Sequence, residues 1–370
     1  MKHAQIAAES NGSNLAAMAR GVVPVAQGGF AAPLLNAWQR LERGATLPTQ
    51  CYAFAASLAC TMLATADWEF FTAGGVGALL PLCREPGYFA RWRMPGAREV
   101  FEPGNCLCDT PQSADLLADA LARQGRPVRF DRMPADSLLV PALVRAMRGR
   151  GWLSVRPAVP CPTIALDESW AEPESRFNSG RRSDFRRAAR RAEEIGQVAY
   201  EVLSPTEAEF DALFDEAIGV EVQSWKREAG TAIAVDRDKE AFFREYFRRA
   251  AAQGQLRIAF LRIDGRAAAM QLALEWQQRF WLFKIGYDEA YGKCSPGTLL
   301  MLHTIGWAAQ RGLVAYELLG GVEPWIAEFW TREEHPCVQL RTYPFGPRGI
   351  AAIASDAFSA LVRRVSRPLR

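Results

Sequence analysis

The chain has 370 residues, of which 49% are hydrophobic and 23% charged, with 29 Gly and 22 Pro. This composition excludes disordered and collagen-like proteins, and the length predicts two domains or one large duplicated unit. The 44 Lys and Arg residues nearly balance the 41 Asp and Glu residues, which leaves a formal net charge of +3. No global field therefore predicts a nucleic-acid or polyanion binder.

Cysteine and histidine usage argues against metal and redox centres. The eight cysteines contain no C-x-x-C pair, and the three histidines (3, 303 and 335) lie far apart in the sequence. We expect reduced thiols and no metal. The first thirty residues lack the pattern of a secretory signal, and the longest uncharged stretch, 51–66, is shorter than the ~20 residues of a membrane helix. We expect that stretch to form a buried helix and the protein to be cytoplasmic.

The first half of the chain predicts a mixed α/β domain. Residues 1–48 have weak periodicity and are expected to form an arm before a domain over 49–165. Within that domain, strand-like segments at 68–71, 77–83, 127–131 and 152–157 alternate with helical patterns at 115–124 and 137–148. Proline, Asn, Ser and Gly are dense over 158–180, which predicts a domain boundary there.

The second half predicts a meander of strands followed by a helix. Helical patterns at 183–195, 206–228 and 239–252 surround a strand at 198–203, and Thr206 with Glu209 has the spacing of a capping box. Strands at 256–262 and 267–275 are joined by Asp264-Gly265, which is a hairpin signal. A strand at 279–287, a helix at 296–311 and a strand at 313–319 follow.

The C-terminal tail, 351–370, predicts a short amphipathic helix. It carries arginines at positions 363, 364, 367 and 370, near the end where cations are favoured. Peripheral membrane contact through this basic tail is a further expectation.

The loop from Tyr291 to Thr298 joins the strand at 279–287 to a helix, with Ser295 at the cap position and Pro296 at the first helical position. The first turn of a helix has unpaired N–H donors and the positive end of a dipole, which favour a phosphate. Lys293 adds a cation. The loop is therefore a candidate pyrophosphate cradle, with Lys293, Ser295, Gly297 and Thr298 as binding residues; the alternative is an ordinary helix start.

Four blocks in the second half resemble the Fem-like branch of the acyl-CoA N-acyltransferase (GNAT) superfamily, which is associated with bacterial cellulose and exopolysaccharide synthesis. They are Arg181-Arg182-Ser183-Asp184-Phe185-Arg186-Arg187, Ser224-Trp225-Lys226-Arg227-Glu228-Ala229-Gly230-Thr231-Ala232, the loop with its Leu299-Leu300, and Glu317-Leu318-Leu319-Gly320-Gly321. The phosphate loop of the superfamily usually reads Gln/Arg-x-x-Gly-x-Gly/Ala, and only Gly297 fits that pattern here.

The resemblance implies two tandem GNAT-like domains, each a mixed, largely antiparallel sheet flanked by helices. It implies that the copy over 49–165 is degenerate and that 175–350 is the acyltransferase domain. The implied activity is transfer of an acyl group from acetyl-CoA or another acyl-CoA to an amine acceptor, in polysaccharide or cell-envelope synthesis. The implied partners are these two small molecules, with no specific nucleic acid.

The resemblance also implies site residues. A backbone N–H near Ile285 or Gly286 would hold the thioester carbonyl. Glu317 and Glu323 are candidate bases for the attacking amine, and a raised pKa would suit that role; Tyr291 is a candidate acid for the leaving thiolate. Further residues would border the loop or line the acceptor pocket: Trp225, Lys226, Tyr287 and Asp288. The plainer alternatives are a solvent-facing Glu317, a turn residue at Glu323, and a turn cap at Asp288.

Two other functions stay open on the sequence alone. A catalytically silent scaffold would keep the fold without the chemistry. A nucleic-acid or anion-binding module could use the arginine-rich helix, whose like-charge pairs, 186 with 190 and 187 with 191, destabilise a helix unless they are relieved. Glu193 and Glu194 offer partial relief, so a solvated or internally paired face is a third interpretation of these arginines.

Overall fold

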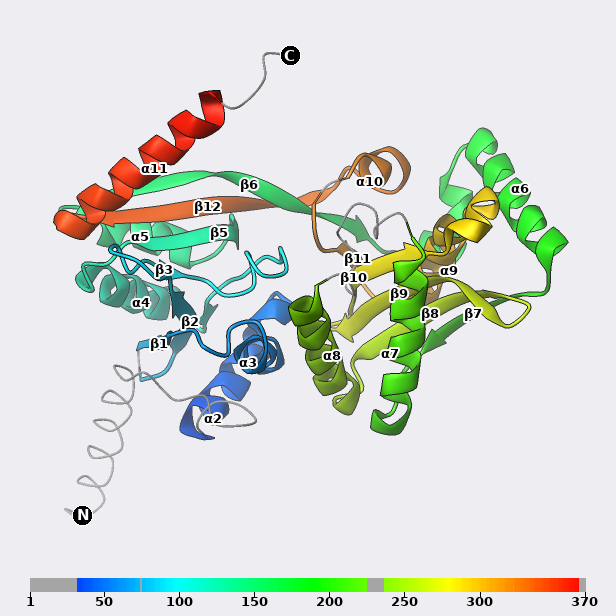
Figure 1. Ribbon diagram of the computed structural model, residues 1–370, viewed down its shortest axis with the longest axis horizontal. Helices are drawn as coiled ribbons and strands as arrows, with labels where there is room; N and C mark the ends of the chain where they lie inside the picture. The colour runs from blue at the N-terminus through cyan, green and yellow to red at the C-terminus, as the bar shows by residue number, and fades with distance from the viewer. Residues whose placement is uncertain (1–31, 74, 225–235, 322, 366–370) are drawn as a thin grey trace. The chain divides into compact units, whose positions relative to one another are not determined.

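The computed structural model describes residues 32–73, 75–224, 236–321 and 323–365. The chain divides into two compact units: unit 1 contains Met1–Val159 and Pro336–Arg370, and unit 2 contains Pro160–His335 (Figure 1). The sequence predicted separate domains over 49–165 and 175–350. In the structure the chain instead returns to unit 1 at Pro336, because strand β12 (Glu334–Pro344) pairs with β5 of unit 1 (Val128–Pro134).

Unit 1 is a mixed α/β structure. Besides β5 and β12, its elements are α2 (Ala32–Leu41), the 3-10 turns η1 (Glu42–Gly44) and η2 (Pro48–Gln50), α3 (Tyr52–Cys60), β1 (Trp68–Ala73), β2 (Ala78–Arg84), β3 (Trp92–Arg93), β4 (Leu107–Cys108), α4 (Pro111–Arg123), α5 (Leu139–Ala146) and α11 (Pro347–Val365). Its sheet has the order β1-β2-β3-β5-β12, with β4 also paired to β2; β3 and β5 are parallel, and the other pairs are antiparallel.

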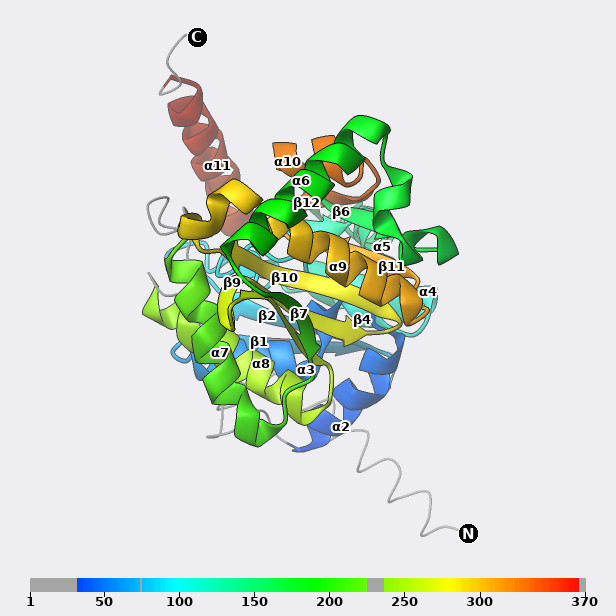
Figure 2. The ribbon, with the colours of Figure 1, turned by 90° about the vertical axis from the view of Figure 1, so that its right-hand side faces the viewer.

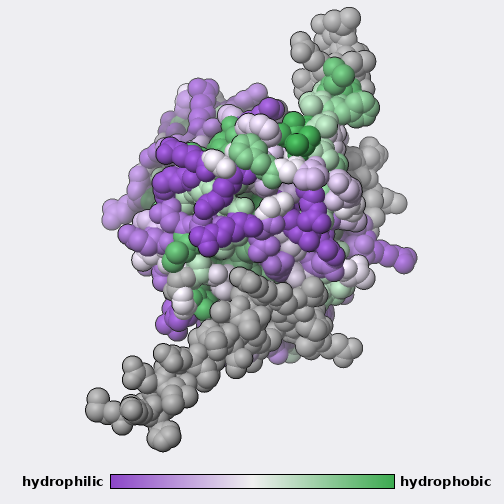
Figure 3. All heavy atoms as spheres, turned by 90° about the vertical axis from the view of Figure 1, so that its left-hand side faces the viewer, coloured by the Kyte–Doolittle hydropathy of each residue, from purple (hydrophilic) through white to green (hydrophobic). Residues whose placement is uncertain are grey.

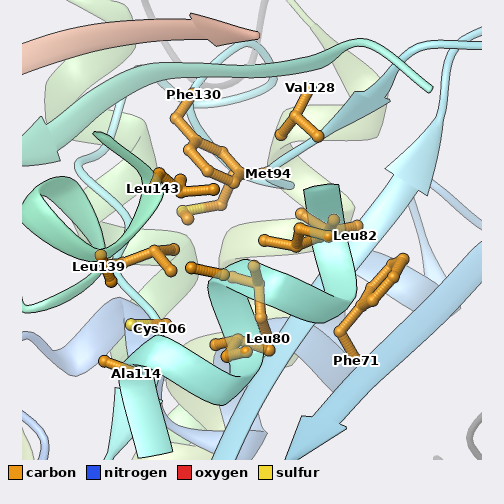
Figure 4. Packing of buried hydrophobic residues seen from close by; sticks show 14 of the residues in the cluster. Phe71, Leu80, Leu82, Met94, Cys106, Ala114, Val128, Phe130, Leu139 and Leu143 are labelled. Carbon is orange, nitrogen blue, oxygen red and sulfur yellow. The ribbon is translucent and has the colours of Figure 1, made fainter. Parts of the chain in front are cut away.

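The core of unit 1 forms where α4 and α5 cover the sheet. Apolar side chains from these helices meet those from β1, β2 and β5, as Figure 4 shows for Leu80, Leu82, Phe130, Leu139 and Leu143. The Thr110 hydroxyl accepts a hydrogen bond from the Ser113 N–H and so caps the start of α4. Unit 1 therefore has its own buried core.

Two parts of unit 1 differ from expectation. Residues 32–48 were predicted to belong to an arm, but α2 packs on the unit: Trp38 is buried and donates from Nε1 to the Gln50 carbonyl at 2.8 Å. Strand β6 (Gly151–Ala165) continues through three prolines into the segment predicted as the boundary. Proline removes only a ladder donor, so it is tolerated in a strand where that side needs no hydrogen bond.

Unit 2 has a sheet of the order β6-β11-β10-β9-β8-β7. Helices α7 and α8 cover one face of it, and α6 and α9 cover the other (Figure 2). Its elements are η3 (Glu168–Ala171), η4 (Pro173–Arg176), α6 (Ser179–Ile195), β7 (Val198–Leu203), α7 (Glu207–Val222), α8 (Arg237–Ala252), β8 (Leu256–Ile263), β9 (Arg266–Trp276), β10 (Arg279–Tyr287), η6 (Glu289–Cys294), α9 (Pro296–Gln310), β11 (Ala315–Leu318) and α10 (Pro324–Phe329).

The local signals in unit 2 are confirmed. Strands β7 to β10 form an antiparallel meander, and Asp264 and Gly265 turn the β8–β9 hairpin with φ of 48° and 76°. Thr206 and Glu209 form the predicted capping box of α7. Helix α7 ends at Val222, earlier than the predicted 228.

The fold class is confirmed: a mixed, largely antiparallel sheet flanked by helices. Within the described ranges, no helix is both long and apolar enough to cross a membrane.

The close approach of α7 to β10 depends on Gly286. A Cβ at this position would lie 3.2 Å from the Cα of Glu221, which is backbone that cannot rotate away. We expect Gly286→Val to lower the free energy of unfolding by about 1–3 kcal/mol through overpacking. The control is Gly219→Ala in α7, where nothing lies within 4 Å of the added Cβ. Urea denaturation measures both; equal stability of the two variants would contradict this packing.

Candidate functional site

The site is built where strand β10 leaves strand β11. The two strands pair in parallel only from Arg279–Ala315 to Leu282–Leu318, whereas β10 continues to Tyr287. The pairing of β10 with β9 is irregular at the same point, between Leu282 and Lys284, so Phe283 is the extra residue of a bulge. Beyond the bulge, the edge of residues 283–287 that faces away from β9 has no partner strand in the described part of the chain.

The two faces of the sheet differ at the opening, by which we mean the point where β10 and β11 separate after Leu282 and Leu318. On one face the Phe280 ring stacks on Tyr316 at 4.7 Å and contacts Trp307 of α9. On the other face Phe283 packs on Tyr246 and Phe247 of α8. Since paired residues share a face, Trp281 and Glu317 lie on the α8 face. Different side chains therefore flank the end of the β10–β11 pairing on the α9 face and on the α8 face.

The Asp288 side chain fixes the first turn of the loop after β10. This residue is buried, and its carboxylate accepts hydrogen bonds from the Ala290 N–H at 2.9 Å and from Arg266 at 3.4 Å. Asp288 therefore caps η6, the plainer of its two predicted roles, and it faces the loop rather than a substrate.

Fewer first-turn amides of α9 are available to bind a phosphate than the sequence suggested. Ser295 stands at the cap position of α9, but it adopts a left-handed conformation (φ 48°) and its side chain makes no capping bond. Pro296 has no N–H, and the Thr298 and Leu299 amides both donate to the Ser295 carbonyl, at 3.0 and 3.2 Å. Thr298 is thus not the free backbone donor that we predicted. The N–H of Gly297 is the first-turn amide that keeps no acceptor among the described residues.

Two aromatic residues predicted to act near substrate lie beneath the loop. A Cβ on Gly297 would lie 3.4 Å from Cδ1 of Tyr287, so that ring lies against the helix start. Tyr287 and Tyr291 are partly buried and pack on the apolar cluster that contains Leu299 and Leu300. Their packing shapes the loop.

The arginine-rich helix α6 packs beside this loop. Arg191 donates from Nη1 to the Lys293 carbonyl at 3.2 Å, and both side chains are exposed. Of the other arginines of α6, Arg187 pairs with Asp184, Arg190 pairs with Glu194, and Arg181 lies over the Phe329 ring. Two separate predictions, the basic helix and the phosphate loop, therefore meet at one cationic surface.

A charged cluster lies on the α8 face next to the point where β10 and β11 separate. Glu317 is 1% exposed, forms an ion pair with Arg279, and lies 3.0 Å from Nε2 of His335. Burial raises the pKa of Glu317, but the hydrogen bonds and charges of His335 and Arg279 outweigh it and hold the pKa below its ordinary value of 4.5. The raised pKa expected of a base is therefore absent at Glu317.

The remaining predicted residues are placed as follows. Ile285 and Gly286 lie on the part of β10 that extends beyond its pairing with β11, where they pair with Gln271 and Met270 of β9. Glu323 is exposed at the start of α10 and accepts a hydrogen bond from Trp325 Nε1 at 2.6 Å. Trp225 and Lys226 lie outside the described residues. No group of three or more potential metal-binding side chains occurs in the part of the chain that the structure describes.

Sequence reasoning missed Arg191, Arg279 and His335 as members of the site. Lys293 and Arg191 are 102 positions apart, and Glu317 and His335 are 18 apart. The partners lie on different elements, α6 with η6 and β11 with β12, so no local periodicity signals these contacts. The one sequence feature that pointed to any of these three residues was the cluster of arginines in α6, which includes Arg191.

The family comparison agrees with this geometry. Residues 179–325 match the acetyltransferase (GNAT) domain family. The match begins at α6 and ends in α10, so it includes the loop, β10 and β11. Among curated proteins, none matches the sequence.

Solved structures share the fold over both units. FemX has a TM-score of 0.54 at 10% identity, with 84% of this chain and 96% of that chain covered. The C-terminal domain of a candidate lysylphosphatidylglycerol synthetase from Agrobacterium fabrum gives 0.52 at 13% identity, with 88% and 96% covered. A protein of unknown function from Bacteroides thetaiotaomicron gives 0.52 at 11%, with 83% and 97% covered. At these identities the likeness shows the fold alone.

The Glu317 cluster makes stability depend on pH. Because the folded-state pKa of Glu317 is lowered, its stabilisation is present above about 4.5 and is lost as the pH falls through the lower folded value. We expect the free energy of unfolding of the unaltered protein to fall more steeply from pH 5 to pH 3 than that of Glu317→Gln. Urea denaturation across this range measures both slopes; parallel slopes would contradict the ion-pair assignment.

Proposed function

We propose that unit 2 transfers an acyl group from an acyl-CoA, with acetyl-CoA as the simplest case, to an amine acceptor. The observation that carries the proposal is the segment 283–287 of β10, which extends beyond the pairing with β11 and leads directly into a cationic loop at the start of α9. The GNAT family match over 179–325 supports the same class of reaction.

The loop suits the anionic part of the donor. The Gly297 N–H at the positive end of the α9 dipole, the Lys293 ammonium and the Arg191 guanidinium are three donors to a pyrophosphate or nucleotide phosphate. This placement favours donor binding over an independent nucleic-acid module for α6, because Arg191 joins the loop itself. A silent scaffold would have no use for the same arrangement.

The segment of β10 beyond its pairing with β11 suits the thioester end of the donor. A backbone N–H of residues 283–286 that faces the opening would donate to the thioester carbonyl and stabilise the negative charge that develops on its oxygen. The thioester supplies the activated acyl carbon, and the amine attacks it directly. Loss of one such donor costs on the order of 100- to 1,000-fold in rate in well-studied enzymes.

The acceptor in this proposal is an amine of a polysaccharide or cell-envelope precursor. Its support is the resemblance of four sequence blocks to the Fem-like branch, together with the fold shared with FemX. The segment that contains Trp225 and Lys226 follows α7 in the sequence and belongs to one of those blocks.

Calorimetric titration of the full chain with acetyl-CoA tests the donor site. We expect saturable binding that is abolished by Gly297→Asp and weakened at least tenfold by Lys293→Glu, because each places a carboxylate next to the donor phosphates. The added Cβ at Gly297 would meet only Tyr287 at 3.4 Å, so the fold should persist, as circular dichroism would show.

The matched control for charge reversal is Lys239→Glu at the start of α8, where an acidic residue suits the helix dipole. This variant should bind acetyl-CoA as the unaltered protein does. Absence of binding by the unaltered protein would refute the proposed function; equal binding by all three variants would refute the loop as the phosphate site.

A further inference from the structure

We propose that His335 is the general base that takes the proton from the attacking amine and that Glu317 is its positioning residue. The inference rests on the proposed function and names a catalytic group for it. His335 was not among the predicted site residues, and Glu317 takes a different role from the one predicted.

The geometry is that of a histidine held by a buried carboxylate. The Glu317 side chain is 2% exposed, whereas that of His335 is 51% exposed, so one imidazole edge bonds to the carboxylate while the rest of the ring meets solvent. The Nε2 atom lies 3.0 Å and 3.3 Å from the two carboxylate oxygens. Such a partner fixes the orientation and tautomer of an imidazole, as in other carboxylate–histidine pairs.

The location relative to the opening supports the role. Glu317 pairs with Trp281, one residue before the last paired position, Leu282–Leu318. The pair therefore lies at the closed end of the opening, on the α8 face, while the cationic loop lies at the start of α9 on the other face. A donor anchored at the loop would present its carbonyl carbon at β10 and leave the α8 face to the amine.

Of the two groups, the imidazole is the better proton acceptor. Arg279 and His335 both favour the ionised form of Glu317, and the hydrogen bonds occupy its oxygens. Histidine exchanges its proton near neutral pH. Among the charged groups, Glu317 of β11 contacts the His335 ring and is itself paired with Arg279 of β10; Glu333 and Glu334 adjoin His335 in sequence.

The step balances without another reagent. The amine nitrogen forms a bond to the acyl carbon, and His335 accepts the proton that this nitrogen loses. The carbon–sulfur bond then breaks, and the CoA thiolate leaves and takes a proton from water. The imidazolium returns its proton to solvent, which its exposed edge permits.

Nuclear magnetic resonance of the full chain with labelled histidine tests the assignment without a known acceptor. The chain has only three histidines, so His335→Gln and His303→Gln assign the ring signals. We expect acetyl-CoA to shift the His335 signals, and Glu317→Gln to move the midpoint of the His335 titration to lower pH, since the carboxylate favours the protonated ring. Saturation with acetyl-CoA that leaves the His335 signals unmoved would overturn the inference.

Acetyl-CoA hydrolysis, followed by thiol release, adds a kinetic readout in which water replaces the amine. We expect His335→Gln to lower the rate by roughly 100-fold or more and to remove its fall at acidic pH, with acetyl-CoA affinity unchanged. Full hydrolysis by His335→Gln would overturn the base while leaving the proposed function intact. Failure of the unaltered protein to bind acetyl-CoA would overturn both.

An independent observation concerns α11, for which we infer contact with an anionic lipid surface. Its first half is seated on unit 1: Ala352 is buried, and Asp356 bonds to Arg91, Arg341 and Tyr343. From Ala357 onward the described side chains are exposed, and the helix projects from the unit (Figure 1).

The described projecting part of α11 has an apolar surface, and the sequence that follows it is basic. Phe358 and Leu361 are 68% and 58% exposed and, by helical spacing, share a face with Ile350, opposite Ala352 and Asp356. Hydrophobic residues, in green, are seen where the helix projects at the top of Figure 3. In the sequence, Arg363, Arg364, Arg367 and Arg370 follow, and no carboxylate occurs after Asp356. Apolar side chains with adjacent arginines match the acyl and headgroup regions of an anionic bilayer, whereas a protein groove would not require the arginines.

Vesicle flotation of the full chain tests this surface. We expect binding to vesicles of phosphatidylcholine and phosphatidylglycerol but not to phosphatidylcholine alone. The double variant Phe358→Glu with Leu361→Glu should bind at least roughly tenfold more weakly. Leu116→Glu, an exposed apolar position on α4, is the matched control and should bind normally. Equal binding to both vesicle types, or dimers in sedimentation that the double variant abolishes, would overturn the inference.

Discussion

The separation of β10 from β11 is the constraint on which the candidate site depends. A sheet normally satisfies its backbone groups with neighbouring strands, and an unpaired edge inside a unit needs another partner. Here the parallel pairing stops at Leu282–Leu318, and the bulge at Phe283 turns the rest of β10 away from its neighbour. The segment after the bulge keeps its pairing with β9 and extends past the end of the pairing with β11. Support from one neighbouring strand, with a second edge beyond the β11 pairing, is the arrangement that the proposed carbonyl site requires.

The loop that follows β10 is preorganised in the same sense. Asp288 fixes its first turn from within, and Ser295 takes a left-handed conformation that costs a non-glycine residue of order 1–3 kcal/mol. That conformation sends the Ser295 carbonyl to the Thr298 and Leu299 amides and leaves the Gly297 amide as the donor. Helix α6 then supplies the charge that a single amide lacks, through Arg191 beside Lys293. The proposed anion site therefore relies mainly on side-chain cations, and less on the helix terminus than the sequence implied.

Features governed by neighbours in sequence could be predicted, and features governed by tertiary contact could not. The Thr206–Glu209 capping box, the Asp264-Gly265 turn, and the strands at 198–203 and 279–287 follow from local rules and appear with little or no change. The course of β6 through its prolines depends on which strand edge is free, and the return of the chain to unit 1 depends on the pairing of β12 with β5. At the site, the loop at the start of α9 was predicted from its residues, and a carbonyl-binding N–H near Ile285 or Gly286 was implied by the family resemblance. The Glu317–His335 and Arg191–Lys293 contacts join segments with no shared period, so only the folded chain brings them together.

A crystal structure of the full chain with a non-hydrolysable acetyl-CoA analogue would show whether β10 binds the thioester carbonyl. We expect the carbonyl oxygen of the analogue within hydrogen-bond distance of a backbone N–H of residues 283–286, with its pyrophosphate at the Gly297 amide. An analogue bound elsewhere, or one whose carbonyl faces only side chains while β10 pairs with another strand, would contradict it.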